Sequence, residues 1–463
     1  MVQTLGFPEE FESIVKSLWA LRLSHFSDKL DAAGVQADVL FSSQTAAQPD
    51  LKKGDNAAAK WKAKTLPTLL ETLALQYLVS TLLRMPLTIG ELHGWAVTEV
   101  IPFVRAIRFV PSGLKKRMAA EYHNALDTLT PLGPDHLRRA IHHLALLYQH
   151  HFSLKLPSLN VPPLLFRYLK HLALPLEIFR ATNGLAQILK IDFAFPQPSG
   201  RQYVSRLPEI TLASLLVIAT KLYHPFDDYP RSIHDPDDPA ALAIDWDAWS
   251  KALNGHRGRL DIGDHLLPGT EIQVRSEDAM YLSSNQMDDY LDWYERTWVD
   301  ETRAESAPRG ASKQLLEMFP VSSDSKRSAY DARSEATREH ESKMVELRET
   351  MLNLQGRRVM GSDAKSDAGD ANPPVGALYK RYRRADELSP HARDFHNAMA
   401  NLAAIELDTL LTAVLQLEGK ILAWRKQQLR DEGKDDGVGE EGLKEPGTSS
   451  ELEEGEDDEE GDD

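Results

Sequence analysis

The stretch Leu207–Pro230, LPEITLASLLVIATKLYHPFDDYP, decides how the rest of this chain can fold. Pro208 presets the backbone of a first helical turn, and the adjacent Glu209 suits the positive end of the helix dipole. From Ile210 to Leu222 almost every side chain is apolar or small, and a helix that is apolar on all sides belongs in a protein interior. The run is too short to span a bilayer, which takes roughly 20 residues. The stretch therefore predicts a central buried helix of an all-α domain.

The negative charge of the 463-residue chain is concentrated at its C-terminal end. The net charge is −17, but residues 431–463 hold 17 Asp and Glu against Lys434 and Lys444, which places −15 in that segment alone. The first 430 residues are therefore close to neutral, and the total charge does not argue against their binding a nucleic acid. We expect residues 431–463 to be a disordered acidic tail, because they cannot bury enough apolar surface to fold.

The composition excludes several kinds of site. The chain has no cysteine, which excludes disulfides, thiol nucleophiles and zinc sites with thiolate ligands. It also lacks the glycine-rich phosphate loops, the G-x-S-x-G elbow and the H-E-x-x-H zinc motif. It shows no secretory signal pattern and no apolar run of membrane length. We therefore expect no enzyme activity, no cofactor and no membrane segment.

Two groups of polar residues are weak candidates for metal ligands. A predicted helix carries His142, His143, His150 and His151, but no carboxylate lies beside them on that helix. A loop carries Asp235, Asp237 and Asp238, which lack the spacing of a calcium loop. We interpret the histidines as residues of a helix surface or of the rim of the core, and we expect no metal site.

The chain before the central stretch follows a simple order of elements. A dense apolar helix is predicted from Pro67 and ends at Pro86. Thr88 and Glu91 then have the spacing of a capping box, and the helix that they begin carries Trp95. The order is thus a buried helix, a proline and a capped helix with a tryptophan.

The same order returns in the second half of the chain. The buried helix 208–222 is followed by Pro225, an acidic loop and a helix that begins at Asp245 and carries tryptophans. We interpret residues 5–156, with an inserted loop at 31–62, and residues 157–300 as two divergent tandem helical repeats. The second repeat closes with a helix on which one face is marked at steps of four, three and four residues by Met287, Leu291, Tyr294 and Trp298.

The remainder of the chain divides into a linker, a helical region and the acidic tail. Residues 301–375 are predicted to be a linker with one short amphipathic helix. Residues 376–430 are predicted to be a C-terminal helical region, in which apolar residues recur at alternating steps of four and three: Ala403, Leu407, Leu410, Val414, Leu417, Ile421 and Trp424. Such a stripe favours packing against one partner helix, in the same chain or in another.

Two clusters of basic residues are the candidate nucleic-acid-binding sites. The first cluster is Lys115, Lys116 and Arg117, and the second is Lys380, Arg381, Arg383 and Arg384 around Tyr382. Lysine and arginine gain affinity by displacing counterions from a phosphate backbone, and such contacts position a protein without reading sequence. The alternative interpretation is a nuclear-localisation patch or a solvated face.

Several blocks of the sequence resemble one protein family. The run IATKLYHPFDDYP at 218–230 is similar to the centre of a cyclin-type repeat. The longer block LPEITLASLLVIATKLYHPFDD at 207–228, together with four further blocks, resembles the TFIIB-like subunit of the RNA polymerase I core factor, or selectivity factor. These blocks are FPEEFESIVKSLWALRLSHF at 7–26, LPTLLETLALQYLVSTLLRMPLTIGELHGWA at 66–96, DDYLDWYERTW at 288–298, and the region from GALYKRYRR to LEGKILAWRKQ at 376–427.

The resemblance implies two tandem cyclin folds that sit on the core promoter of ribosomal DNA in the nucleus and nucleolus. The implied partners are other core-factor subunits, TBP and RNA polymerase I, which the family helps to recruit for pre-rRNA synthesis. The family begins with a zinc ribbon rich in cysteine, whereas Met1 lies just before the first predicted cyclin helix and the chain has no cysteine. We expect either that the sequence lacks an N-terminal part or that the protein lacks the ribbon. No residue here takes the family's zinc site.

Two other classes of function remain open at the level of sequence. The first is a cyclin that activates a protein kinase, because Lys221 fits the lysine of the cyclin signature; against it, the first repeat has Arg84-Met85-Pro86 where a cyclin would show that lysine. The second is an all-helical scaffold protein, which fits the acidic tail and the apolar stripe. A cyclin predicts a co-purifying kinase, and a scaffold predicts no salt-dependent binding of DNA.

Overall fold

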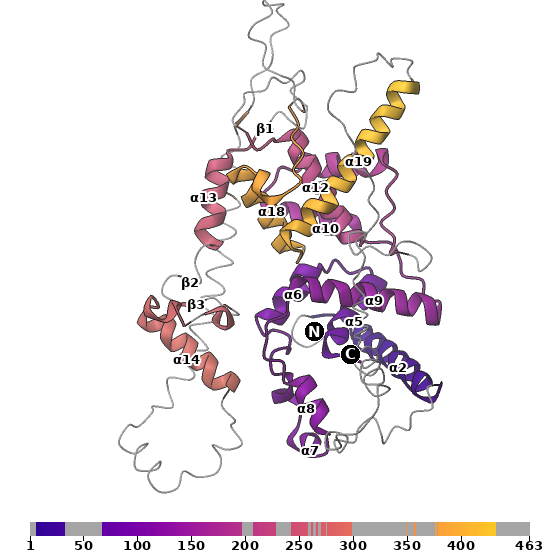
Figure 1. Cartoon of the computed structure of the whole chain (residues 1–463), viewed down its shortest axis with the longest axis vertical. Helices are drawn as coiled ribbons and strands as arrows, with labels where there is room; N and C mark the ends of the chain where they lie inside the picture. The colour runs from indigo at the N-terminus through magenta and orange to yellow at the C-terminus, as the bar shows by residue number, and fades with distance from the viewer. Residues whose placement is uncertain are drawn as a thin grey trace, which may run out of the picture. The chain divides into compact units, whose positions relative to one another are not determined.

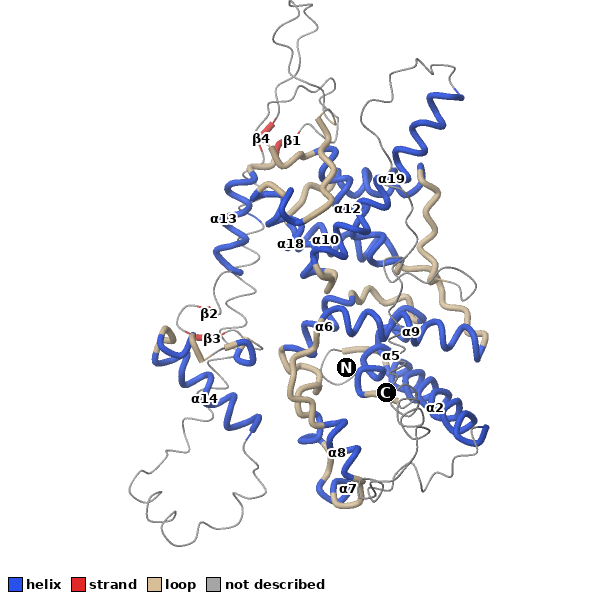
Figure 2. The backbone as a smooth tube through the Cα atoms, viewed as in Figure 1, coloured by secondary structure: helices blue, strands red, loops and turns tan. Residues whose placement is uncertain are grey.

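Helices make up nearly all the regular structure that the computed structural model describes (Figure 2). The described residues are 6–32, 67–196, 207–227, 242–257, 261–262, 265–266, 270–274, 276–298, 349, 356–357, 376 and 378–431. The strands in these ranges are two-residue segments in two antiparallel pairs, β1 (Leu242–Ala243) with β4 (Gly356–Arg357) and β2 (Asp261–Ile262) with β3 (His265–Leu266). The predicted all-α class is confirmed.

A first cluster of helices forms around α5 (Leu69–Leu82). Both α2 (Glu9–Ala32) and α9 (Pro134–Phe152) pack along α5, and α6 (Ile89–Val97) contacts α5 and α9. The apolar side chains between them are at most 5% exposed and include Leu18, Leu73, Leu78, Ile141, Leu144 and Tyr148. The Tyr148 hydroxyl donates to the Leu18 carbonyl at 2.8 Å, so even the polar tip of this core residue has a partner.

The start of α6 shows the predicted capping box. The Thr88 hydroxyl accepts from the Glu91 amide, and the Glu91 carboxylate accepts from the Thr88 amide, each at 3.0 Å. The two bonds satisfy amides that a helix start leaves without intrahelical partners. Between α6 and α9 the chain forms only short helices: the 3-10 turn Ala106–Phe109, α7 (Ser112–Lys115) and α8 (Ala120–Leu126).

A second cluster of helices surrounds α12 (Pro208–Tyr223), the predicted central helix. Every side chain of α12 from Leu212 to Lys221 is buried, which confirms the prediction. Its neighbours are α10 (Val161–Leu172), α11 (Glu177–Ile188) and α18 (Pro390–Leu402), and α18 also contacts α13 (Trp246–Arg257) (Figure 1). Rings from three of these regions pack together with centroids 4.6 to 5.8 Å apart: Phe226, Trp246, Trp249 and Phe395.

The C-terminal helical region consists of α18 and α19 (Leu407–Asp431) rather than one continuous stripe. Ala404 has a left-handed φ of 48°, and the Ile405 amide donates to the Ala400 carbonyl at 2.9 Å, which is the hydrogen bond of a helix-ending motif. The chain forms one compact unit up to Glu418 and a second from Gly419. In the second unit Trp424 is 38% exposed, so the predicted stripe is buried only before that boundary.

A buried carboxylate joins the two helical clusters. Glu209, at the start of α12, is 1% exposed and accepts hydrogen bonds from the hydroxyls of Tyr77 at 2.8 Å and Tyr168 at 2.6 Å. It also accepts from the Ile89 amide at 3.0 Å, which is an otherwise unpaired amide in the first turn of α6. One side chain of the second cluster therefore ties together α5, α6 and α10.

The helix α14 (Ser284–Trp298) buries a different face from the one that its spacing marks. Trp293 and Thr297 are 5% and 0% exposed, whereas Leu291 and Tyr294 are 52% and 47% exposed. The indole of Trp293 donates to the Glu99 carboxylate at 3.1 Å, so the buried face contacts the segment after α6. The regular spacing of the apolar residues did identify a helix face, but not the one that packs.

Some predictions fall outside the described residues. Helix α2 continues to Ala32, two residues into the predicted insertion, and the rest of that insertion, nearly all of the linker and the acidic tail lie outside the described ranges. Among the described helices no single one is long and apolar enough to cross a membrane; α18 and α19, bent by 101°, reach that length only as a pair.

Candidate nucleic-acid interface

The basic cluster around Tyr382 lies on a segment that leads into α18. Its backbone is held by two tyrosines that point inward, since Tyr382 is 9% exposed and the Tyr379 hydroxyl donates to the Glu418 carboxylate at 2.5 Å. The side chains of Lys380, Arg383 and Arg384 are exposed. The sequence therefore alternates anchoring rings with outward cations, and this alternation presents three positive charges on a fixed backbone.

Arg381, the fourth cation of the cluster, has a different environment. Its Nε lies 3.3 Å from Glu418 Oε2, and its side chain is only partly exposed. Glu418 is 3% exposed and is also paired with Lys221, whose Nζ lies 2.7 Å from Oε1. Arg381 therefore helps to neutralise a buried carboxylate, and the sequence alone could not separate it from its three exposed neighbours.

Lys221 is the buried centre of this arrangement. Its ammonium group lies over the rings of Tyr379 and Tyr382, at 4.5 and 4.6 Å from their centroids. Burial lowers the pKa of Lys221, and the Glu418 carboxylate opposes that change. Burial also raises the pKa of Tyr379 far above its ordinary value, so that its hydroxyl remains a donor. The lysine that fits the cyclin signature is thus committed to an internal ion pair.

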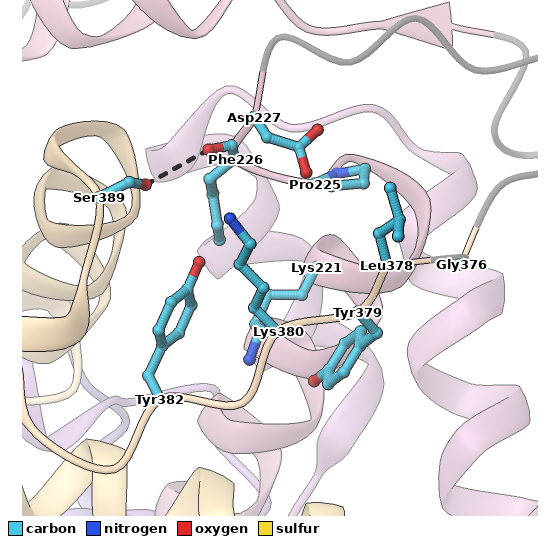
Figure 3. A pocket seen from close by; sticks show the side chains of 10 residues that line it. All are labelled: Lys221, Pro225, Phe226, Asp227, Gly376, Leu378, Tyr379, Lys380, Tyr382 and Ser389. Carbon is cyan, nitrogen blue, oxygen red and sulfur yellow. Dashed lines mark hydrogen bonds between the residues drawn. The ribbon is translucent and has the colours of Figure 1, made fainter. Parts of the chain in front are cut away.

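A small pocket opens between the 376–382 segment and the turn that follows α12. Figure 3 shows Lys221 and Lys380 among its lining residues, with Tyr379 and Tyr382 on the segment and Phe226 on the turn. The Ser389 hydroxyl donates to the Phe226 carbonyl at 3.3 Å and, as the N-cap of α18, accepts from the Ala392 amide. The pocket is the space beside the anchored segment, and both the exposed Lys380 and the buried Lys221 line it.

The first basic cluster begins with Lys115, the last residue of α7, and continues with Lys116 and Arg117 directly after that helix. Lys115 is half-buried: its Nζ lies 3.4 Å from the Arg108 carbonyl, and its own carbonyl accepts from His123 at 2.8 Å. Lys116 and Arg117 are exposed. The structure therefore offers two outward cations here, on the first helical cluster, and three on the segment before α18, in the second.

The weak metal candidates gain no support. In the parts of the chain that the structure describes, no group of three or more His, Asp or Glu side chains is arranged to hold a metal ion. His142 is 8% exposed, and burial lowers the pKa of its ring. The His151 ring packs against that of His25, with centroids 4.0 Å apart. The aspartates of the loop at 235–238 lie outside the described residues.

The pattern of two helical clusters, each built on one deeply buried helix, defines a protein with tandem cyclin folds. Two domain families match in the same order: the N-terminal cyclin domain of Rrn7/TAF1B over residues 1–112 and the C-terminal cyclin domain of Rrn7/TAF1B over residues 130–298. Together these matches cover more than half of the chain. The chain belongs to the Rrn7/TAF1B family.

The proteins similar to this chain include a transcription initiation factor and a chain in a solved crystal structure. The RNA polymerase I-specific transcription initiation factor rrn7 of Schizosaccharomyces pombe is 24% identical over an alignment of 345 residues, which covers 68% of this chain and 62% of the relative. The chain therefore matches somewhat less than two thirds of that relative's length. A chain in the crystal structure of the S. cerevisiae core factor has the same fold, with a TM-score of 0.50, 14% identity and coverage of 91% and 92% of the two chains.

Proposed function

We propose that this protein is a transcription initiation factor of RNA polymerase I, a core-factor subunit that binds the core promoter of ribosomal DNA. The observation that carries the proposal is the ordered pair of Rrn7/TAF1B cyclin domains, together with a relative that is named as an initiation factor for this polymerase. The proposed partners are promoter DNA, other core-factor subunits, TBP and RNA polymerase I. The proposed place of action is the nucleus and its nucleolus, and the proposal assigns the protein no catalytic step.

We further propose that Lys380, Arg383 and Arg384 contact DNA phosphates. Their backbone is anchored by the half-buried Tyr379 and the buried Tyr382, so little backbone conformational freedom is lost when the cations meet a phosphate backbone. Arg381 is left out of this set because its guanidinium already faces Glu418. Lys116 and Arg117 form a second, smaller set on the first cyclin fold. Such contacts position the protein on the duplex, so they predict affinity and salt dependence rather than sequence preference.

The direct test measures how binding to a labelled core-promoter fragment depends on salt. We expect the combined substitutions Lys380→Ala, Arg383→Ala and Arg384→Ala to weaken binding and to reduce the slope of log affinity against log salt by about 2 to 3, because each phosphate contact contributes about 0.9. A matched control removes three exposed cations from other surfaces, Lys155, Arg180 and Lys251, by substitution with alanine. An unchanged slope in the first variant, or the same loss in the control, would exclude this segment as the DNA contact.

The rival functions make different predictions in the same experiment. A scaffold protein would bind the fragment weakly and without the steep salt dependence of phosphate contacts. A kinase-activating cyclin is disfavoured by the burial of Lys221, which is 5% exposed and paired with Glu418 inside the second fold. The proposal therefore rests on family and on surface charge together, and the salt slope separates it from a helical scaffold.

A further inference from the structure

The helix α14 carries a second apolar face that the described part of the chain leaves exposed. This α14 face consists of Leu291 and Tyr294, which are 52% and 47% exposed, and of the half-buried rings of Tyr290 and Trp298 on either side of them. Just before the helix, Met280 and Tyr281 are each 89% exposed. Soluble proteins rarely expose large apolar side chains in such a group unless the surface meets a partner.

The rings of the α14 face form a regular ladder. Tyr290, Tyr294 and Trp298 are spaced four residues apart, with neighbouring centroids separated by 6.4 and 6.3 Å and planes inclined by 30°. Side chains four residues apart lie on one side of a helix, one above the next. The ladder therefore presents a row of aromatic surfaces along the helix rather than an isolated ring.

Most of the charged residues of α14 itself are negative. Asp288, Asp292 and Glu295 are exposed on the same helix, which holds one more aspartate and one arginine. A surface of this sign repels the phosphates of a nucleic acid and attracts a basic segment. The α14 face is thus opposite in sign to the DNA-contact residues proposed above.

One end of the ladder already shows the kind of group that it accepts. The guanidinium of Arg105 lies over the Trp298 ring, 5.2 Å from its centroid, and donates to the Thr297 carbonyl at 2.8 Å. Arginine is the cation that most often stacks on aromatic rings in proteins. The neighbouring Tyr294 ring is next to Trp298 in the ladder and is 47% exposed to solvent.

We propose that the α14 face is a docking surface for a basic segment of another protein. An arginine or lysine of that segment stacks on Tyr294, an aliphatic side chain covers Leu291, and Asp288 faces a further positive charge. This inference goes beyond promoter binding, because it involves none of the cations assigned to DNA and stands on the surface of one helix.

Photo-crosslinking from position 294 tests the proposal in the full-length protein purified with its native partners. The probe is p-benzoylphenylalanine, which keeps an aromatic ring at that position, and the crosslinked peptides are sequenced by mass spectrometry. We expect crosslinks to one partner protein within a segment of net positive charge that contains arginine or lysine at the crosslink. Crosslinks to DNA, to a second copy of this chain or to a neutral or acidic segment, or no crosslink at all, would overturn the proposal.

Substitutions then test the apolar contacts and the charge attraction separately on the same complex. We expect Leu291→Ser combined with Tyr294→Ser to weaken retention of the crosslinked partner by about 10-fold or more, as loss of a hot-spot aromatic does. Asp288→Lys, which removes no packing, is expected to weaken it several-fold. Leu176→Ser changes an exposed apolar residue at the N-cap of α11, which is 62% exposed, and should have no effect. Full retention of the partner by both the Leu291/Tyr294 variant and Asp288→Lys would contradict the assignment.

Discussion

At the scale of single residues, the buried carboxylate of Glu209 carries the most unusual chemistry in the described chain. Burial raises the pKa of Glu209 to about 7, although the hydroxyls of Tyr168 and Tyr77 and the amide of Ile89 each favour the ionised form. The same burial, together with Glu209 itself, raises the pKa values of Tyr77 and Tyr168 well above their ordinary value. Near neutral pH this junction between the two cyclin folds therefore lies close to a change of protonation.

The raised pKa predicts how stability depends on pH. Because the folded protein holds the Glu209 proton more tightly than the unfolded chain, the stabilisation is complete below the ordinary pKa of 4.5 and is lost as pH rises through about 7. The shift corresponds to about 3 kcal/mol. We expect the difference in unfolding free energy between the wild type and Glu209→Gln, measured with urea, to fall by that amount over this window.

Using the variant as the reference at each pH removes the contributions of other groups. His396 is one of these, since burial lowers its pKa to about 4, which makes stability rise with pH. A difference that stayed constant or increased from pH 4.5 to 7 would show that the tyrosines hold Glu209 ionised. The pKa would then lie at or below its ordinary value, contrary to this account.

At the scale of elements, two glycines of α6 have opposite structural roles. A Cβ on Gly90 would lie 1.9 Å from the backbone carbonyl oxygen of Leu402, at the end of α18, whereas a Cβ on Gly94 would meet nothing within 4 Å. Backbone cannot move aside as the end of a side chain can. Gly90 therefore permits the close approach of α6 and α18, which belong to different helical clusters.

This contrast predicts opposite effects of the same substitution within one helix. Gly94→Ala should stabilise the protein by up to about 1 kcal/mol, because alanine is the better helix former. Gly90→Ala should destabilise it by about 1 to 3 kcal/mol, because the added methyl group forces α6 and α18 apart. Thermal unfolding of both variants measures the two effects. Equal stabilisation by both would show that α6 and α18 do not pack in this way.

At the scale of the whole molecule, the sequence predicted the structural elements that depend on residues close together in the chain. The central helix follows from Pro208 and an unbroken apolar run, and the capping box follows from the spacing of Thr88 and Glu91. Lys221 and Glu418 are 197 residues apart, so no local pattern could pair them or remove Arg381 from the basic cluster. The face of α14 that packs was missed for the same reason, because the helix has two apolar faces and only a distant partner, Glu99, selects one.

The sequence shows Glu209 as a carboxylate at the start of an apolar helix, but it does not show that this residue joins the two helical clusters. A carboxylate beside an otherwise apolar helix suits the helix dipole, which explains its position without any partner. Only the fold shows that it is fully buried and bound by groups from three other helices. The two helical repeats were thus predictable from repeated local order and their cyclin fold from the resemblance of sequence blocks to a known family, whereas the contacts that join them were not.

The central claim is that this protein is an initiation factor of RNA polymerase I. It is tested most directly by identifying the proteins that bind to it in the cell. The measurement is affinity purification of the endogenous protein from nuclei, with identification of the co-purifying proteins by mass spectrometry. The account predicts recovery of TBP, RNA polymerase I subunits and further core-factor subunits. Recovery of a protein kinase without TBP, or of none of these partners, would contradict it.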